Sequence, residues 1–323
     1  MKLIVQKFGG SSVRDAQRLR NVAAIIADTA RMGSRVIVVL SAQGDTTDEL
    51  LQKARELSRS PSARELDALL ATGEQVSVAL CAILLEEMGL SAVSLSAWQV
   101  GIHTGTTHGD ARIERIDTQR VLRELDAGKI VLVAGFQGID KEGDITTLGR
   151  GGSDTSAVAL AAAFGADRCE IYTDVDGVYT ADPRIVPQAR KHREINCDEM
   201  LDLAIRGAQV LHSRCVELAR DNRVDLEVLS SLEHTEGTKV VSEPAAVLPH
   251  LAGVTKSETV VSVVGSGLMR LPGAAARLYQ VLNDAGISVR EVGQSERCIY
   301  ARVDEDHALS ALRLAHRIFF EQE

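Results

Sequence analysis

Short apolar runs alternate along this chain with longer stretches in which apolar residues recur every three or four positions. The runs are continuous and rich in β-branched residues, which is typical of strands buried on both faces of a sheet. We expect strands at residues 3–6, 36–40, 92–95, 130–134, 169–172 and 226–229. We expect helices at residues 14–31, 65–88, 118–127, 197–205 and 213–222. This alternation predicts an α/β fold, with helices covering both faces of a mostly parallel sheet.

The pattern changes after residue 240. Residues 242–250 contain two prolines and no hydrophobic periodicity, so we expect a linker at 241–250 that separates residues 1–240 from 251–323. In the second part we expect strands at 259–264, 287–292 and 298–303, and helices at 272–285 and 305–319. This order of elements predicts a small sheet with its helices on one face.

Composition narrows the classes of protein that need considering. The chain has 323 residues, 45% of them hydrophobic and 25% charged, as in ordinary globular proteins. Its net charge of −9 and its 3% aromatic residues argue against nucleic-acid binding. No strictly apolar run is longer than the one at 157–164, which is too short to span a membrane. Five scattered cysteines without a C-x-x-C pair fit a reducing compartment, so we expect a cytoplasmic protein.

Glycine-rich turns follow several of the predicted strands. Lys7 precedes Gly9, Gly10 and Ser11 at the point where the first strand meets a helix. Glycines let a phosphate approach the backbone, and a helix N-terminus offers unpaired N–H donors. The segment matches neither a Walker A loop nor a G-x-G-x-x-G fingerprint, so phosphate binding and simple turn formation both remain open. A further helix start is expected at Thr46 and Glu49, which have capping-box spacing.

A second glycine-rich segment, at residues 147–154, surrounds a single arginine. Ser153 or Asp154 is a suitable N-cap for the alanine-rich helix that follows. A cap alone does not explain why Arg150 lies between glycines. A guanidinium that must approach a carboxylate or phosphate closely does need such neighbours, so we favour an anion-binding role.

Carboxylates at two places in the sequence are candidates for a functional role. Asp174 and Asp176 follow a predicted strand and precede Arg184, so they either form a turn or help to hold Mg²⁺ beside a phosphate. Glu74 lies within an otherwise small and apolar helical stretch. If that helix face is internal, the carboxylate needs a cation such as a substrate ammonium, and if it is external, water solvates it. No metal-ligating histidine spacing and no nucleophile–base constellation is evident.

These motifs together resemble the aspartate kinases of the amino acid kinase family. The matching segments are residues 7–13, 41–42, 73–74, 135–138, 147–154 and 173–184. Residues 263–265, 272–275 and 286–287 resemble the ACT domain, an amino-acid-sensing module. The resemblance implies a three-layer amino acid kinase fold followed by a small ferredoxin-like α+β domain. It also implies ATP-dependent phosphorylation of the side-chain carboxylate of L-aspartate.

The resemblance assigns roles residue by residue. The residues expected at the transferring phosphoryl group and its nucleotide are Lys7, Gly9, Gly10, Ser11 and Asp154, with Asp154 organising Lys7. The residues expected to hold aspartate are Ser41, Thr47, Glu74, Arg150 and Ser153, with Arg150 on the α-carboxylate and Glu74 on the ammonium. The residues expected to contact ATP are Thr173, Asp174, Tyr179 and Arg184. ATP and Mg²⁺ are the expected cofactors, and no residue is assigned as a metal ligand.

The chemistry of the residues agrees with this assignment. A carboxylate nucleophile is already ionised at neutral pH, so no general base is needed, and none was found. Catalysis then consists of holding two anions in line and offsetting their repulsion. Two departures from the family pattern stand out. Gln209 replaces a lysine that contacts nucleotide in some members, and one ACT-like unit is evident where two are usual.

A single ACT-like unit would need a second subunit to pair with. We therefore expect a homodimer joined partly through residues 251–323, with reduced or altered feedback by lysine or threonine. Two alternatives remain. One is a different kinase of the same fold, acting on glutamate, acetylglutamate, carbamate or UMP. The other is a non-catalytic amino-acid sensor, which the retained Lys7, Glu74, Arg150 and Asp174 disfavour.

Overall fold

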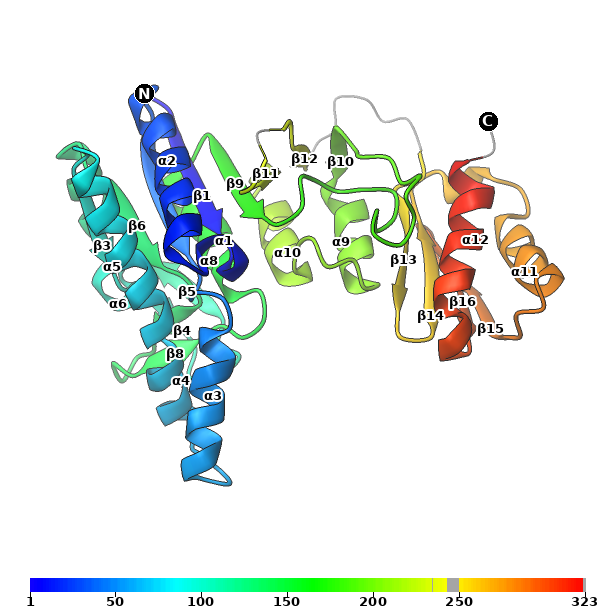
Figure 1. Ribbon diagram of the computed structural model, residues 1–323, viewed down its shortest axis with the longest axis horizontal. Coiled ribbons are helices and arrows are strands. Elements are labelled where there is room, and N and C mark those ends of the chain that lie inside the picture. The colour runs from blue at the N-terminus through cyan, green and yellow to red at the C-terminus, as the bar shows by residue number, and fades with distance from the viewer. Residues whose placement is uncertain (234, 243–249, 322–323) are drawn as a thin grey trace. The chain divides into compact units, whose positions relative to one another are not determined.

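The computed structural model describes residues 1–233, 235–242 and 250–321 (Figure 1). The chain forms two compact units. The first contains Met1–Asp176 and Asp221–Glu236, and the second contains Gly177–Arg220 and Gly237–Glu323. Most of the predicted linker lies outside the described residues, so the domain boundary at 241–250 stays a prediction.

A parallel sheet forms the centre of the first unit. Its strands are β1 (Leu3–Phe8), β2 (Arg35–Leu40), β3 (Ala92–Leu95), β6 (Ile130–Ala134), β9 (Arg168–Thr173) and β11 (Leu226–Ser230). They lie in the order β11-β9-β1-β2-β6-β3, and every neighbouring pair is parallel. All six expected strands are therefore confirmed within one or two residues, and the mostly parallel α/β sheet is confirmed as well. Parallel strands end at one common edge, which is where ligands bind in such sheets.

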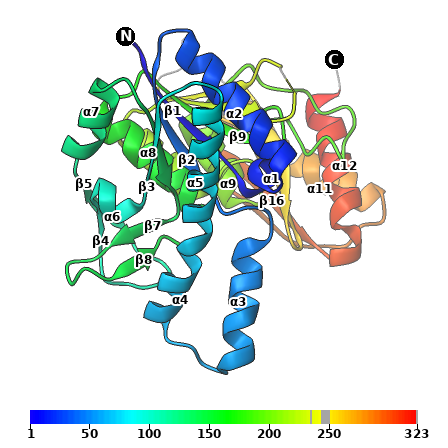
Figure 2. The same ribbon diagram turned by 60° about the vertical axis from the view of Figure 1, so that its left-hand side comes forward.

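Helices cover both faces of this sheet. On one face, α2 (Ala16–Arg31) and α5 (Thr72–Glu87) lie over the sheet (Figure 2). They share a hydrophobic core with alternate residues of β2, including Val36, Val38 and Leu40. The intervening residues of β2 are also buried, and strand geometry directs them to the opposite face. That face carries α7 (Gln119–Asp126) and α8 (Gly152–Phe164), which contact the sheet strands.

The helix expected at 65–88 is interrupted. It forms α4 (Ala63–Leu70) and α5, which are separated at Ala71. The side-chain amide of Gln137 donates to the Ala71 carbonyl oxygen at 2.9 Å, and a side chain inserted into the backbone ladder is a common cause of such a break. By length and apolar composition alone, Ala63–Glu87 is long enough to cross a membrane. Buried core helices pass the same test, and this stretch buries Asp67 and Glu74 in the protein interior.

A small second sheet in the first unit was not expected. Its strands are β4 (Ile102–Thr104), β5 (Ile113–Ile116), β7 (Gln137–Ile139) and β8 (Ile145–Thr147), in the order β5-β4-β7-β8. The helices α3 (Thr46–Leu57), α4 and α6 (Ala97–Val100) complete this part of the unit. The expected capping box is wrong, because Asp45 precedes α3 and the Thr46 hydroxyl donates instead to the Gln43 carbonyl at 2.6 Å.

The second unit is built around an antiparallel sheet. Its strands are β13 (Gly253–Ser257), β14 (Val260–Val264), β15 (Val289–Gln294) and β16 (Cys298–Val303), in the order β13-β14-β16-β15. Two helices, α11 (Ala274–Asp284) and α12 (Ala308–Phe320), share one hydrophobic core with the sheet, which confirms the expected α+β arrangement. The strand β13 was missed. The unit also contains the parallel pair β10 (Glu194–Asn196) and β12 (Thr238–Val241) and the helices α9 (Cys197–Ile205) and α10 (Ser213–Asp221).

Candidate active site

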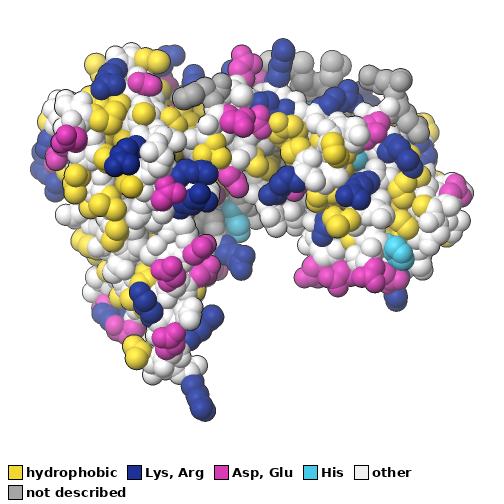
Figure 3. Space-filling model, viewed as in Figure 1, with side chains coloured by type: hydrophobic (Ala, Val, Ile, Leu, Met, Phe, Trp, Pro, Cys, Tyr) yellow, Lys and Arg dark blue, Asp and Glu magenta, His cyan; other side chains and the backbone are white. Residues whose placement is uncertain are grey.

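A cavity of about 480 Å³ lies in the first unit and collects most of the residues singled out from the sequence. The predicted residues that line it are Lys7, Gly9, Gly10, Ser41, Thr47, Glu74, Arg150, Ser153 and Asp154. On the face drawn in Figure 3, positive and negative side chains are interspersed rather than gathered into one basic area.

Lys7 and Asp154 form an ion pair at one end of the cavity. The Lys7 Nζ lies 2.6 Å from Asp154 Oδ1, and the two side chains are only 10% and 14% exposed. Lys7 is on β1, opposite Val39 of β2 and Ile171 of β9, while Asp154 is in the first turn of α8. A nearly buried ammonium requires such a partner. The carboxylate thus holds the lysine in place where β1 ends.

The turn after β1 requires glycine for steric reasons. A Cβ atom at Gly10 would lie 2.8 Å from the Ala42 carbonyl oxygen, which is closer than real Cβ contacts. A Cβ atom at Gly9 would lie 3.4 Å from the Lys7 ammonium. Gly10 begins the short helix α1 (Gly10–Val13), whose first N–H groups have no partner within the helix. Ser11 is exposed and lies outside the residues that line the cavity.

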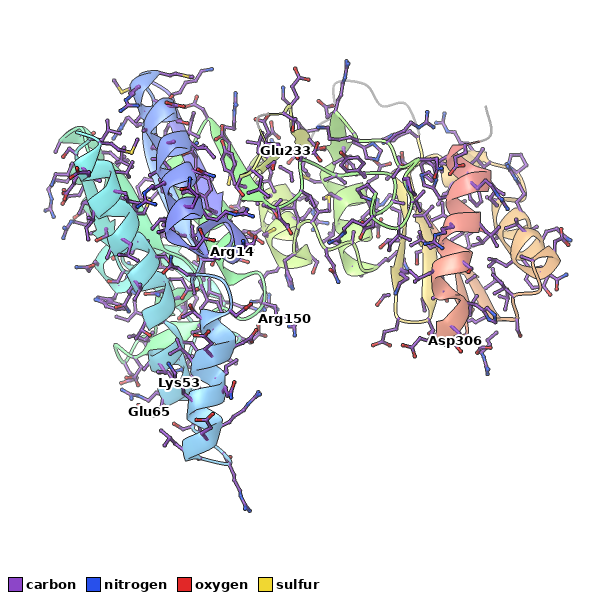
Figure 4. All side chains as sticks on the ribbon, in the orientation of Figure 1. Arg14, Lys53, Glu65, Arg150, Glu233 and Asp306 are labelled. Atoms are coloured by element: carbon purple, nitrogen blue, oxygen red, sulfur yellow. The ribbon has the colours of Figure 1, made fainter. Side chains whose placement is uncertain are left out.

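Arg150 enters the cavity from the loop that precedes α8, where Figure 4 marks it. Gly149 and Gly151 on either side have φ values of +73° and +69°, which L side chains rarely adopt. Gly151 is the N-cap of α8 and makes no side-chain cap, so neither Ser153 nor Asp154 serves as the cap. No described residue forms an ion pair with the exposed Arg150 guanidinium, which leaves its donors for a ligand.

Glu74 places an acidic group in the same cavity as the positively charged Arg150. The residue is 3% exposed, and its Oε1 accepts a hydrogen bond from the Ala42 N–H at 3.0 Å. The other oxygen, Oε2, is buried and has no hydrogen-bond partner among the described residues. Burial raises the pKa of Glu74 to about 8. The structure therefore answers the question left by the sequence: this helix face is internal, and residues 1–233, 235–242 and 250–321 supply no cation for its carboxylate.

Several residues of the cavity were missed or received no role from the sequence. Phe136 adopts a φ of +69°, a conformation that favours glycine, and its N–H donates to the Ser156 hydroxyl at 3.1 Å. A Cβ atom at Gly152 would lie 2.8 Å from the Phe136 ring. Ala42 and Gly44 also line the cavity. Backbone strain of this kind leaves no mark in the hydrophobic pattern, so only the motif match at 135–138 pointed to this turn.

The four residues expected to contact ATP from the end of β9 onward do not line the cavity. Thr173 is the last residue of β9, whose neighbour is β1, and Asp174 follows it. The Thr173 hydroxyl donates to Asp174 Oδ1 at 3.0 Å. Tyr179 and Arg184 belong to the second unit. Arg184 donates through Nε and Nη2 to Asp182 at 3.0 and 2.8 Å, and these bonds lower the pKa of Asp182. The nucleotide roles of these four residues stay predictions.

A cluster that could hold a metal ion lies elsewhere in the first unit. His108, Asp140 and Asp144 place one potential ligand atom each within 4.8 Å of one another. None of the three lines the cavity, and Arg64 already forms an ion pair with Asp144. The cluster is therefore separate from the cavity that contains Lys7 and Arg150.

Comparisons with known proteins agree with the motifs. Residues 2–230 match the amino acid kinase family, and residues 261–319 match the ACT domain. The aspartokinase of Geobacillus stearothermophilus is 44% identical over 396 aligned residues, covering 99% of this chain and 97% of that protein. The alignment is longer than this chain, so the relative contains residues without a counterpart here.

Solved structures show the same architecture. E. coli aspartokinase III in complex with aspartate and ADP has a TM-score of 0.86 at 23% identity, covering 99% of this chain and 100% of that chain, which shows a shared fold. The same E. coli enzyme in complex with lysine and aspartate has a TM-score of 0.72 at 27% identity, covering 94% of this chain and 79% of that chain. The resemblance read from the motifs is confirmed. The chain belongs to the aspartokinases of the amino acid kinase family, and its second unit carries an ACT domain.

Proposed function

We propose that this protein transfers the γ-phosphoryl group of ATP to the side-chain carboxylate of L-aspartate, giving 4-phospho-L-aspartate and ADP. One observation carries the proposal. A single cavity contains a buried carboxylate, Glu74, and a guanidinium, Arg150, and neither has an oppositely charged partner in the described part of the chain. An α-amino acid supplies the missing ammonium and carboxylate together. The E. coli structure that contains aspartate and ADP supports the choice of ligands.

In this proposal, Arg150 binds the α-carboxylate of aspartate and Glu74 binds its ammonium group. Ser41, Thr47 and Ser153 line the same cavity and supply hydroxyl groups for the remaining oxygens. The side-chain carboxylate of the substrate then points toward Lys7. Because two charged groups fix the backbone of the substrate, the reacting carboxylate has little freedom to leave the line of attack.

The reaction requires charge neutralisation more than proton transfer. A carboxylate oxygen of aspartate attacks the γ-phosphorus, the bond to the β–γ bridging oxygen breaks, and ADP leaves with that electron pair. Lys7 offsets the negative charge on the transferring group, and Asp154 holds Lys7 in position through the 2.6 Å ion pair. The backbone N–H of Gly10 is a further donor toward the phosphate. Thr173, Asp174, Tyr179 and Arg184 are proposed to contact ATP.

The residues of the cavity fit a magnesium ion that arrives with its nucleotide. Among the described lining residues, only Glu74 and Asp154 carry carboxylates, and no group of three ligands is present to enclose an ion. Mg²⁺ usually keeps several waters and binds through one or two carboxylates together with substrate phosphates. Asp154 and Asp174 are the side chains proposed to face it. The ion would supply additional neutralisation of the phosphate charge.

A substrate panel tests the proposed activity. ADP release is measured with L-aspartate, L-glutamate, N-acetylglutamate, carbamate and UMP as phosphoryl acceptors. We expect aspartate-dependent ADP release and an acyl phosphate that hydroxylamine traps. Preference for another acceptor would assign a different kinase of this fold. ATP consumption that does not depend on aspartate would favour the sensor alternative.

We also propose that the protein is a cytoplasmic homodimer joined partly through residues 251–323. The ACT domain supports an amino-acid effector, and the E. coli relative has been crystallised with lysine. Because one such domain is evident here, we propose reduced or altered feedback by lysine or threonine. Sedimentation at micromolar concentration tests the dimer, and a monomer would contradict it. Strong inhibition by millimolar lysine or threonine would contradict the altered feedback.

A further inference from the structure

The segment between β9 and β10 is part of the core of the ACT-containing unit. It carries Tyr179 and Arg184, the residues of this unit proposed to contact ATP. Ala181 and Val186 of the same segment are buried in one hydrophobic cluster with the sheet β13–β16 and with α11 and α12. The position of the segment is therefore fixed by the packing of the ACT domain.

Thr180 lies at the centre of this arrangement and is 5% exposed. Its N–H donates to the Arg190 carbonyl at 2.9 Å, and its carbonyl oxygen accepts the Val254 N–H of β13 at 2.7 Å. Its hydroxyl oxygen accepts the Arg190 N–H at 3.0 Å and lies 2.9 Å from Nε2 of His316. Every polar group of the residue adjacent to Tyr179 is thus bound within this unit.

His316 links this threonine to the last helix. The side chain is fully buried, and its ring stacks on Phe320 with 5.1 Å between centroids. Its Nδ1 lies 2.8 Å from Glu321 Oε1, and a carboxylate accepts hydrogen bonds, so Nδ1 carries the proton. In a neutral imidazole, Nε2 then accepts the hydrogen bond of the Thr180 hydroxyl.

Two further bonds join the same helix face to the same segment. Arg313 Nε donates to the Ile185 carbonyl at 3.1 Å, and Arg190 Nη2 donates to the Phe320 carbonyl at 2.6 Å. Residues 313, 316 and 320 are spaced by three and four, so they lie on one face of α12. The helix therefore holds the segment along its length, and of these three side-chain hydrogen bonds the one at His316 is buried.

We propose that His316 is a positioning residue for ATP binding: through Thr180 it fixes the segment that presents Tyr179 and Arg184 to the nucleotide. The placement of α12 in the ACT domain then sets the affinity for ATP without any contact between α12 and the nucleotide. This inference rests on the proposed nucleotide roles of Tyr179 and Arg184. It adds a specific connection between the ACT domain and ATP binding.

The test compares nucleotide binding in three variants of the full chain. His316→Ala removes both hydrogen bonds of the imidazole ring, whereas His316→Gln retains an oxygen that accepts a hydrogen bond from the Thr180 hydroxyl. Leu278→Ala is the matched control, because Leu278 is fully buried in the same core on α11 and is not among the residues bonded to the segment. The Kd for ADP is measured by calorimetry, and KM for ATP and for aspartate by ADP release.

For His316→Ala we expect the Kd for ADP and the KM for ATP to rise about tenfold, corresponding to one net hydrogen bond. We expect kcat at saturating ATP and the KM for aspartate to change less than twofold. His316→Gln should restore most of the nucleotide affinity. Leu278→Ala should lower the melting temperature without a selective loss of affinity for ADP and ATP. If His316→Ala does not fold, Thr180→Val removes the hydrogen bond to His316 together with the one from the Arg190 N–H. It is expected to raise the KM for ATP and to leave the KM for aspartate within twofold.

The inference would be overturned if folded His316→Ala bound ADP as tightly as the wild type. It would also be overturned if His316→Ala changed the KM for ATP and the KM for aspartate equally and Leu278→Ala did the same. Direct ADP binding separates this result from a failure of the proposed function. A wild-type protein that binds ADP but does not phosphorylate aspartate contradicts the proposed reaction, while the His316 comparison still decides the inference. A wild-type protein that does not bind ADP overturns both.

Discussion

The buried carboxylate of Glu74 makes aspartate binding depend on pH in a predictable direction. Burial raises the pKa of Glu74 to about 8, so the carboxyl group is mostly protonated at pH 6 and half ionised near pH 8. A substrate ammonium binds the ionised form. Aspartate binding at pH 6 to 7 should therefore release about one proton per site, and affinity should rise as pH increases toward 8.

The size of the effect follows from the same value. Each pH unit below the pKa costs about 1.4 kcal/mol of binding free energy, because the carboxyl group must first lose its proton. The apparent Kd for aspartate should fall about tenfold between pH 6 and pH 7, and about fiftyfold between pH 6 and pH 8. Above that range the affinity should level off. The ammonium group of free aspartate remains protonated from pH 6 to 8, so the substrate does not contribute to the change.

Calorimetric titration with L-aspartate measures both quantities. Running each pH in two buffers with different ionisation enthalpies gives the number of protons released. Glu74→Gln is the matched control because it keeps the shape of the side chain and removes its charge. We expect this variant to bind aspartate about 3 kcal/mol more weakly at pH 8 and to lose the pH dependence. A wild-type Kd that stays constant from pH 6 to 8, without proton release, would refute the reasoning.

Three further substitutions test the other parts of the cavity. Lys7→Ala should lower kcat by about 100-fold to 1000-fold with little change in the Kd for aspartate, and a raised aspartate KM with intact kcat would contradict the assigned role. Arg150→Lys should do the opposite, weakening aspartate binding by about tenfold to 100-fold because the bidentate contact is lost; an unchanged KM for aspartate would argue against that contact. Gly10→Ala places a Cβ atom 2.8 Å from the Ala42 carbonyl, so the free energy of unfolding should fall by about 1 to 3 kcal/mol in a denaturant titration. A Gly10→Ala variant as stable as the wild type would show that the turn can shift.

The large sheet could be predicted because its strands carry a clear hydrophobic signal. Residues 130–134 were placed at the observed bounds because strands in a covered parallel sheet are apolar along their length, and residues 92–95, with one serine among apolar residues, were also placed at theirs. The small sheet was missed because β4, β7 and β8 have only three residues each and include polar ones such as His103 and Gln137. Tertiary contacts rather than local preference form strands as short as these.

The candidate site was predictable to the extent that glycines mark it. Turns that allow close approach to a ligand leave glycines in the sequence, as around Arg150. The burial of Glu74 was not predictable, because its helix is apolar on several sides and the pattern does not identify the internal face. The strained turn at Phe136 left no mark in the hydrophobic pattern, since a left-handed conformation at a non-glycine residue arises only from its surroundings; the motif match at 135–138 was its one indication.

The order of strands in the ACT-containing unit limits how copies of this protein can associate. At one end of its sheet, β13 already donates a backbone hydrogen bond to Thr180, whereas β15 at the other end is largely exposed. Among the described strands of this sheet, β15 thus offers the more open edge. A filament forms only when each copy contacts two neighbours through two complementary surfaces. A copy that pairs through the β15 edge alone contacts a single neighbour. Growth by this route would stop at a closed pair with twofold symmetry.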